Sequence, residues 1–268
     1  MDPRAALATA LRLHRSGGTL PAIAACRLAV RDGNPVAMRL LGLLLAEAGL
    51  FEEARHWAGR ATARDRSAET LAAEGRVLAA MRDWAAAAAV LREALLLLPG
   101  FAAARLLLDQ AEAAGSAMQA EAAKLFAAGR YGEAAALFKV ACGVRPGDPA
   151  LLHALGTALH EAGQPAESVG AYRAALAIAP ARAATWHNLG SALQATGDLD
   201  GALLAYAQAY AADPASFPRI AQELAAGRAG QVWLSADALR AKLRATARGH
   251  DTGPGKLPAF PGQPPRPR

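Results

Sequence analysis

Apolar residues along most of the chain recur at intervals of three and four, which is the spacing of one face of an α-helix. Leu152, Leu155 and Leu159 show this spacing, and Gly or Pro residues separate one such segment from the next. Aromatic residues make up only 5% of the chain, and Val and Ile, which favour strands, are also scarce. The pattern predicts an all-α chain of short helices and disfavours sandwiches, barrels and doubly wound sheets.

The helical pattern itself repeats with a period of 34 residues. Three stretches align without gaps, each with a turn glycine, a small residue, an aromatic residue, an alanine and a proline at fixed offsets. These positions are Gly129, Ala134, Phe138, Ala141 and Pro146, then Gly163, Ser168, Tyr172, Ala175 and Pro180, then Gly197, Ala202, Tyr206, Ala209 and Pro214. Self-similarity of this length is typical of a solenoid of stacked helix pairs.

The pattern resembles the tetratricopeptide repeat family, in which a large residue and Leu-Gly precede the turn glycine, as Trp186 and Leu189-Gly190 do here. The resemblance implies a right-handed superhelical solenoid of stacked antiparallel helix pairs whose first helices line a concave groove. Weaker repeats begin near Ala68 and Pro35, and a degenerate one precedes them, giving about six in all.

Small and turn-forming residues fit this arrangement. We expect Gly156 and Gly190 to lie where two helices cross closely, and the turn glycines of the three aligned stretches to adopt positive φ. An N-capping side chain precedes a proline at Asn34, Asp148 and Asp213, which predicts three helix starts.

The predicted organisation has three parts: a solenoid over 3–216, capping helices over 217–248, and a disordered Pro/Gly-rich basic tail over 249–268. Residues 101–114 are extra to the repeat and form either an additional helix or an extension of the next first helix. In the second part, Ile220 and Leu224 predict a short helix and Val232-Trp233-Leu234 a short extended run. Ser235 caps a second helix with Leu239 and Leu243 on one face. These helices either cap the stack or dock a partner.

Composition narrows the class of protein further. Alanine accounts for 74 of the 268 residues, which suits close helix crossing, and together with the preference for Arg over Lys it suggests a bacterial source. The formal net charge of +6 belongs to the C-terminal end, because residues 1–216 carry 20 basic and 20 acidic side chains. No apolar run long enough for a membrane span and no export signal is evident, so we expect a cytoplasmic protein.

No catalytic or metal-binding pattern appears in the sequence. Cys26 and Cys142 lie far from any His and fit as small packing residues. We find no zinc-ligand spacing, no phosphate-binding glycine loop and no Gly-x-Ser-x-Gly turn. We therefore expect no enzyme activity, no cofactor and no metal.

Polar residues on the predicted first helices are the candidate partner-binding groove. His153 and His187 occupy the same repeat position, about 10 Å apart, which is too far for one metal ion. The predicted groove residues are Arg39, Glu47, Arg76, Gln119, His153, Thr157, His160, His187, Asn188, Ser191 and Gln194. The groove is thus charged in its N-terminal half and neutral and hydrogen-bonding in its C-terminal half. The Lys/Asn/Arg clamp by which some family members bind chaperone tails is not matched.

The leading hypothesis is a non-enzymatic scaffold that binds a peptide or protein segment in this groove. A second hypothesis is the substrate-recruiting component of a glycosyl- or methyltransferase system whose enzyme is encoded separately. A third, nucleic-acid binding by the basic C-terminal end, is disfavoured by the few aromatics and lysines. The partner's identity and the oligomeric state stay open.

Overall fold

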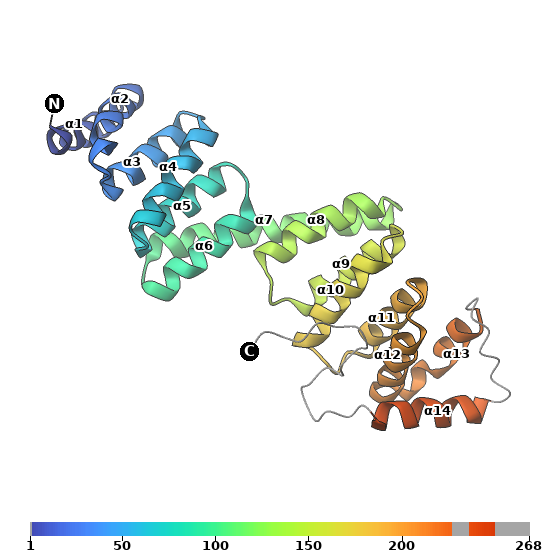
Figure 1. The fold of residues 1–268 in the computed structure, drawn as a ribbon. Helices are drawn as coiled ribbons and strands as arrows, with labels where there is room; N and C mark the ends of the chain where they lie inside the picture. Colours follow the sequence, from blue (N-terminus) through green and yellow to red (C-terminus); the bar gives the residue numbers. More distant parts are fainter. Residues whose placement is uncertain (1, 227–235, 250–268) are drawn as a thin grey trace. The chain divides into compact units, whose positions relative to one another are not determined.

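The computed structural model describes residues 2–226 and 236–249, and within them every regular element is a helix (Figure 1). The predicted all-α class is therefore confirmed. The α-helices are α1 (Pro3–Arg15), α2 (Thr19–Ala29), α3 (Pro35–Glu47), α4 (Phe51–Arg64), α5 (Ala68–Ala80), α6 (Trp84–Leu97), α7 (Ala102–Ala127), α8 (Tyr131–Val144), α9 (Pro149–Glu161), α10 (Pro165–Ile178), α11 (Ala183–Ala195), α12 (Leu199–Ala212), α13 (Phe217–Ala226) and α14 (Ala236–Gly249). Two 3-10 turns, η1 (Val30–Asp32) and η2 (Pro214–Ser216), follow α2 and α12.

The chain divides into two compact units. Unit 1 comprises Met1–Met118 with Gly143–Arg145, and unit 2 comprises Gln119–Cys142 with Pro146–Arg268. Both units are built from antiparallel helix pairs that pack side by side (Figure 1). The pairs are α1 with α2, α3 with α4 and α5 with α6 in unit 1, and α9 with α10 and α11 with α12 in unit 2. The predicted stack of helix pairs is thus confirmed.

Glycines let the two helices of a pair approach closely. A Cβ atom added at Gly156 would lie 2.6 Å from Cε1 of Tyr172, and one at Gly190 would lie 2.6 Å from Cε1 of Tyr206. These distances are too short for any real side chain, so the prediction of close crossing at Gly156 and Gly190 is confirmed. In unit 1 the equivalent Gly75 faces Leu91, whose Cγ would lie 2.6 Å from an added Cβ.

The turns between paired helices share one backbone conformation. The three predicted turn glycines, Gly129, Gly163 and Gly197, have φ values of 75°, 75° and 85°. Arg82 occupies the corresponding turn between α5 and α6 with φ 61°, a left-handed conformation that disfavours a residue with a Cβ. The predicted N-caps at Asn34 and Asp148 are confirmed, because each side chain accepts a main-chain hydrogen bond from the following helix or turn.

Asp213 is confirmed in the same role, although the turn that it caps is the 3-10 turn η2 rather than an α-helix. Its side chain accepts a hydrogen bond of 3.0 Å from the main-chain N–H of Ala215. The chain therefore changes direction at this point before α13 begins.

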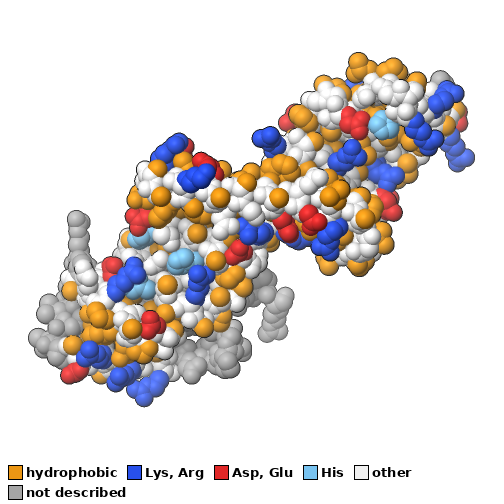
Figure 2. Space-filling view, turned by 180° about the vertical axis from the view of Figure 1, so that it is seen from behind, with side chains coloured by type: hydrophobic (Ala, Val, Ile, Leu, Met, Phe, Trp, Pro, Cys, Tyr) orange, Lys and Arg blue, Asp and Glu red, His pale blue; other side chains and the backbone are white. Residues whose placement is uncertain are grey.

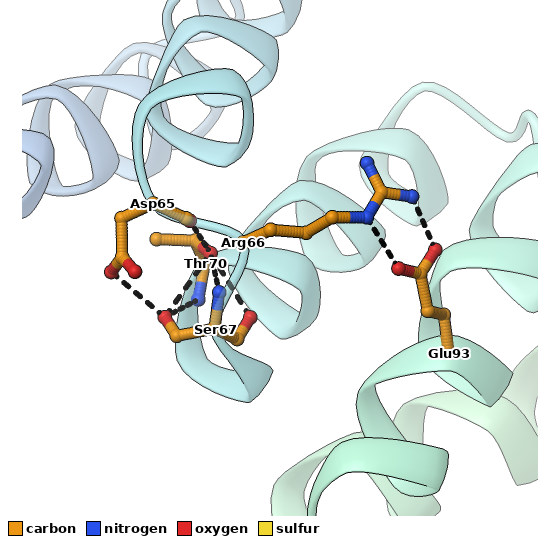
Figure 3. A network of polar contacts seen from close by, with 5 residues as sticks. All are labelled: Asp65, Arg66, Ser67, Thr70 and Glu93. Carbon is orange, nitrogen blue, oxygen red and sulfur yellow. Dashed lines mark hydrogen bonds and ion pairs between the residues drawn. The ribbon is translucent and has the colours of Figure 1, made fainter.

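A polar network fixes the corner between α4 and α5 in unit 1 (Figure 3). Ser67 and Thr70 form a capping box at the start of α5, and the Thr70 hydroxyl also donates to the carbonyl of Asp65 at 2.5 Å. Between them in the chain, Arg66 donates two hydrogen bonds to the carboxylate of Glu93 on α6, at 2.5 and 2.6 Å. One corner thus orients three successive helices of unit 1.

The two units fill their interiors differently. Among its largest fully buried side chains unit 1 has only leucines, namely Leu41, Leu44, Leu45, Leu71 and Leu91. The core cluster of unit 2 contains three tyrosines, a tryptophan and a phenylalanine together with aliphatic residues. Tyr172, Tyr206 and Trp186 are each 3% exposed or less.

The C-terminal helices close the apolar core of unit 2. Leu239 and Leu243 of α14 are buried in the same cluster as Ile220 of α13, and α14 packs along α12. The predicted capping helices are thus confirmed. Two arginines of α14 lie over aromatic rings, Arg240 at 4.2 Å from the ring centre of Phe217 and Arg244 at 5.9 Å from that of Tyr210.

Several predicted features fall outside the described residues. These are the extended run Val232-Trp233-Leu234, the cap at Ser235 and the tail from residue 250 onward.

Residues 101–114, for which the sequence leaves two interpretations, are described: all but Phe101 lie in α7, a single helix of 26 residues. Among the described helices, none combines the length and the apolar character needed to cross a bilayer.

Candidate functional site

A groove in unit 1 gathers side chains from α1, α3 and α5, the first helices of its three pairs, and from Phe101 and α7. Its volume is about 600 Å³. The residues that line it are Leu11 of α1, Val36, Arg39, Leu40 and Leu43 of α3, Glu69, Ala72, Ala73 and Arg76 of α5, Phe101, and Ala103, Leu106, Leu107 and Gln110 of α7. Two of the predicted groove residues, Arg39 and Arg76, are therefore brought together here.

The lining of this groove is largely apolar and partly open to solvent. Leu40, Leu43 and Leu107 are half-buried, whereas Leu106 is 60% exposed and Val36 is 45% exposed. Exposed apolar side chains that lie together on one concave surface are unfavourable in water, and covering them with another molecule is favourable. Such a surface is typical of a binding site.

Charged groups stand among these apolar side chains. Within the described residues Arg39 makes no ion pair or side-chain hydrogen bond. Arg76 lies near the predicted Glu47, with Nη2 at 3.7 Å from Oε1, and the other oxygen of Glu47 is 3.8 Å from Nδ1 of His14. Glu69 is in the first turn of α5, where a carboxylate interacts favourably with the helix dipole.

The remaining predicted residues lie in unit 2, where most of them are already hydrogen-bonded. The Nδ1 atom of His153 is 3.0 Å from the hydroxyl of Thr185, which is fully buried. Tyr172 donates from its hydroxyl to Thr157 at 3.2 Å and also makes a side-chain hydrogen bond with Asn188. These contacts join α9, α10 and α11 into one network.

The same arrangement recurs one repeat later. Tyr206 donates to Oε1 of Gln194 at 3.1 Å and makes a hydrogen bond with Ser191. Gln194 in turn donates to the main-chain carbonyl of Glu223 on α13, at 3.1 Å. The amide of Gln194 is thus occupied by the protein's own main chain.

His187 is the most enclosed of the predicted residues. It is 3% exposed, its ring lies 5.6 Å from the ring of Tyr206, and neither ring nitrogen has a hydrogen-bond partner within the described residues. Burial, and after it the positive charge of Arg219, lower the pKa of His187 to about 4. The ring is therefore neutral near pH 7 and presents almost no surface to a ligand.

The other histidines of this region are less enclosed. Burial and then the charge of Arg182 lower the pKa of His153, which is half-buried. His160 is also half-buried, although its Nδ1 atom is buried and has no hydrogen-bond partner in the part of the chain that the structure describes. Figure 2 shows the histidine side chains of unit 2 close to one another on a single face. Gln119, the last predicted residue, is half-buried on α7.

Sequence reasoning missed the apolar half of the unit 1 groove. Phe101, Leu106 and Leu107 come from the segment that is extra to the repeat, and Leu11 comes from the degenerate first repeat. A signal was present at residues 106–108, which are three leucines in succession: Leu106 is exposed, Leu107 half-buried and Leu108 buried. A helix that buries only part of such a run leaves apolar surface for another molecule.

Two further features of the described residues bear on the chemistry that they can perform. They contain no cluster of three or more His, Cys, Asp or Glu side chains that could hold a metal ion. Cys26 and Cys142 are both buried and free of disulfides, and burial raises the pKa of the Cys26 thiol to about 11. A thiol with so high a pKa is a poor nucleophile at neutral pH.

Comparison with protein families identifies the repeats in unit 2. Residues 125–193 match one model described as a tetratricopeptide repeat, and residues 183–216 match a second model with the same description. Residues 125–216 are therefore similar to tetratricopeptide repeats, as the sequence pattern predicts. No curated protein matches the chain.

Solved structures of the same class resemble the fold at low sequence identity. YrrB, described as a protein with an unusual peptide-binding site, is 16% identical, with a TM-score of 0.39, over 74% of this chain and 96% of that one. The TPR2AB domain of yeast Sti1, described as a complex with pHSP90, is 14% identical, with a TM-score of 0.37, over 82% and 96%. MamA from Desulfovibrio magneticus is 19% identical, with a TM-score of 0.35, over 68% and 96%.

Proposed function

We propose that this chain, whose residues 125–216 are similar to tetratricopeptide repeats, is a protein-binding scaffold and that the groove of unit 1 holds a short segment of its partner. The observation that carries the proposal is the partly exposed apolar lining of this groove, to which α1, α3, α5 and α7 all contribute. Repeats of this class generally serve protein–protein interaction, and a groove on packed helices presents a preformed surface.

The size of the groove supports a segment rather than a whole folded domain as its occupant. Its volume of about 600 Å³ is in the range of about 300–1,000 Å³ that is usual for sites that enclose a ligand. Since the leucines are carried by helices that pack against their neighbours, little ordering of the groove is needed when the segment binds.

Unit 2 is the less favourable place for the same task. The side chains of Gln194 and Thr157 are already bonded within the unit, and His187 is buried. A ligand would have to replace these internal hydrogen bonds before it gained any of its own. The groove of unit 1 requires no such exchange.

Site-specific photocrosslinking tests the proposal. A photoreactive amino acid replaces either Leu106, which lines the groove, or Leu96 on α6, which is 82% exposed and lies outside it. Each full-length variant is irradiated in an extract of the cells that produce the protein. We expect a discrete adduct with one or a few proteins at position 106 and none of these adducts at position 96.

A second pair of substitutions separates binding in the groove from mere proximity. Leu43→Gln and Leu107→Gln place an amide in the apolar lining, and both positions are half-buried. Combined with the photoreactive residue at 106, either change should abolish the adduct while circular dichroism stays unchanged. Equal adducts at 106 and 96, or an adduct at 106 that survives both changes, would show that the groove is not the binding site.

A further inference from the structure

The unit 1 groove combines an apolar lining with two arginines, Arg39 and Arg76. Arg39 lies on α3 three residues after Val36 and four before Leu43, so all three lie on one face of the helix, about one turn apart. Arg76 follows Ala72 and Ala73 on α5 in the same way. Each guanidinium therefore stands next to a stretch of apolar lining.

Only one of the two arginines has an acidic partner among the described residues. Glu47, which is outside the lining, lies 3.7 Å from Nη2 of Arg76, and both side chains are partly exposed. Among the described residues that line the groove, Glu69 at the start of α5 is the only acidic one, so the two arginines leave the lining with an excess of positive charge. Arg39 has no partner among the described residues.

Two guanidinium groups in an apolar setting favour one kind of occupant. Guanidinium binds carboxylate through paired, charge-assisted hydrogen bonds, and a nearby apolar surface that excludes water strengthens them. A lysine-bearing segment would be repelled by Arg39 and Arg76. An uncharged apolar segment would leave Arg39 partly desolvated without a partner among the described residues.

We propose that the groove selects a peptide segment that carries large apolar side chains together with at least one Asp or Glu, with Arg39 and Arg76 as the specificity-determining residues. This inference rests on the proposed function and adds the chemistry of the partner. The apolar side chains supply most of the buried area, and the carboxylate fixes the position of the segment along the groove.

Selection from a phage-displayed library of random 12-residue peptides tests the proposal with the full-length chain as bait. We expect the enriched peptides to contain two or more of Leu, Ile, Phe and Met, with Asp or Glu nearby. The affinity of the most enriched peptide is then measured by fluorescence anisotropy, alongside a synthetic version in which each acidic residue is replaced by its amide.

Matched charge variants show whether the effect is local. The double variant Arg39→Gln/Arg76→Gln should weaken the acidic peptide at least tenfold and change the affinity of its amide version less than threefold. The control is Arg55→Gln/Arg105→Gln, which removes the same charge from exposed positions of α4 and α7 outside the lining. The control pair should change either affinity less than twofold at physiological salt.

The failures of the two proposals are distinguishable. The selection could instead enrich apolar peptides that lack acidic residues, with Leu43→Gln abolishing their binding. That result would overturn the carboxylate preference and leave the scaffold function standing. Equal weakening by both charge variants would also overturn it, because the attraction would then be non-specific. If no peptide is enriched and position 106 forms no adduct, both proposals fall.

Discussion

Units 1 and 2 are both built from helix pairs, but different side chains of the second helices pack against their first helices. In unit 1 Gly75 of α5 faces the side chain of Leu91, and Gly42 of α3 faces Ala58. In unit 2 the corresponding glycines face Tyr172 and Tyr206, whose hydroxyls reach back to Thr157 and Gln194 on the first helices. Unit 2 therefore uses these tyrosine hydroxyls to bond the polar side chains of its first helices, while unit 1 keeps an open apolar groove.

The difference teaches that the strength of a repeat signal and the location of a binding surface are separate questions. The family models match 125–216, which lies almost wholly in unit 2 and where the aromatic position of the repeat is filled by Phe138, Tyr172 and Tyr206. The open groove lies in unit 1, where the repeat is degenerate and Leu91 takes the place of the aromatic residue. A position within a repeat specifies a helix face, but only its neighbours decide whether that face is free.

The largest expected effect comes from removing the aromatic side chain that distinguishes unit 2. Tyr206→Ala deletes a fully buried ring, which typically costs about 3–5 kcal/mol for a large aromatic residue. Hydrogen exchange followed by mass spectrometry should show faster exchange in α9–α12 and unchanged exchange in α1–α6. The matched change in unit 1, Leu91→Ala, should show the reverse. Uniform loss of protection over the whole chain in both variants would mean that the units are not separate in stability.

A smaller effect is the response of unit 2 to acid. The folded pKa of His187 is about 4, below its ordinary value of 6.5, so the unfolded chain binds the extra proton first as pH falls. The stabilising contribution is complete above pH 6.5 and is lost towards pH 4, at up to about 1.4 kcal/mol per pH unit and about 3 kcal/mol in all. His153 contributes in the same direction.

Urea unfolding at several pH values measures this slope. Because carboxylates also titrate in acid, the comparison is between the wild type and His187→Phe, and the difference between them should grow in favour of the variant from pH 6.5 to pH 4. Parallel curves for the two proteins would contradict the assignment to His187.

The next effect concerns the same repeat position at neutral pH. His187→Phe removes two buried ring nitrogens that have no hydrogen-bond partner among the described residues, and we expect a gain in stability of about 1 kcal/mol. His153→Phe should instead destabilise the protein, since it leaves the buried hydroxyl of Thr185 without its partner. Thermal unfolding of both variants at pH 7 checks the signs, and two shifts in the same direction would contradict this account.

The smallest effect belongs to the ion pairs that link successive pairs in unit 1. Arg27 on α2 meets Glu53 on α4 at 2.8 Å, and both side chains are partly exposed. Glu53→Gln removes the charge but keeps an acceptor for Trp57, so the loss should be below about 1 kcal/mol. In 1 M salt the wild type and the variant should unfold at the same urea concentration. A difference that persists in high salt would point to the geometry of the contact rather than its charge.

Most of the fold could be predicted because short-range rules determine it. The 34-residue spacing of Gly129, Gly163 and Gly197 sets the turns, and the Asn34-Pro35 and Asp148-Pro149 pairs set helix starts. The site could be predicted only in part, since repeat position identified Arg39 and Arg76 but gave no information about what covers His187. The bond from Gln194 to the main chain of α13, and the leucines of α7, depend on segments outside the aligned repeat.

The turn at Arg82 shows what a substitution in a turn between paired helices can contribute to the stability of the stack. Five turn glycines between paired helices, Gly17, Gly49, Gly129, Gly163 and Gly197, have φ between 75° and 85°, while Arg82 holds φ 61° despite its Cβ. The packing of α5 against α6 therefore imposes the turn even on an unsuitable residue. Changing Arg82 to Gly would relieve about 1–2 kcal/mol of strain but add roughly 0.5–1 kcal/mol of chain entropy to the unfolded state. Consensus engineering at this turn is thus close to neutral, and gains in thermostability have to come from the helix interfaces.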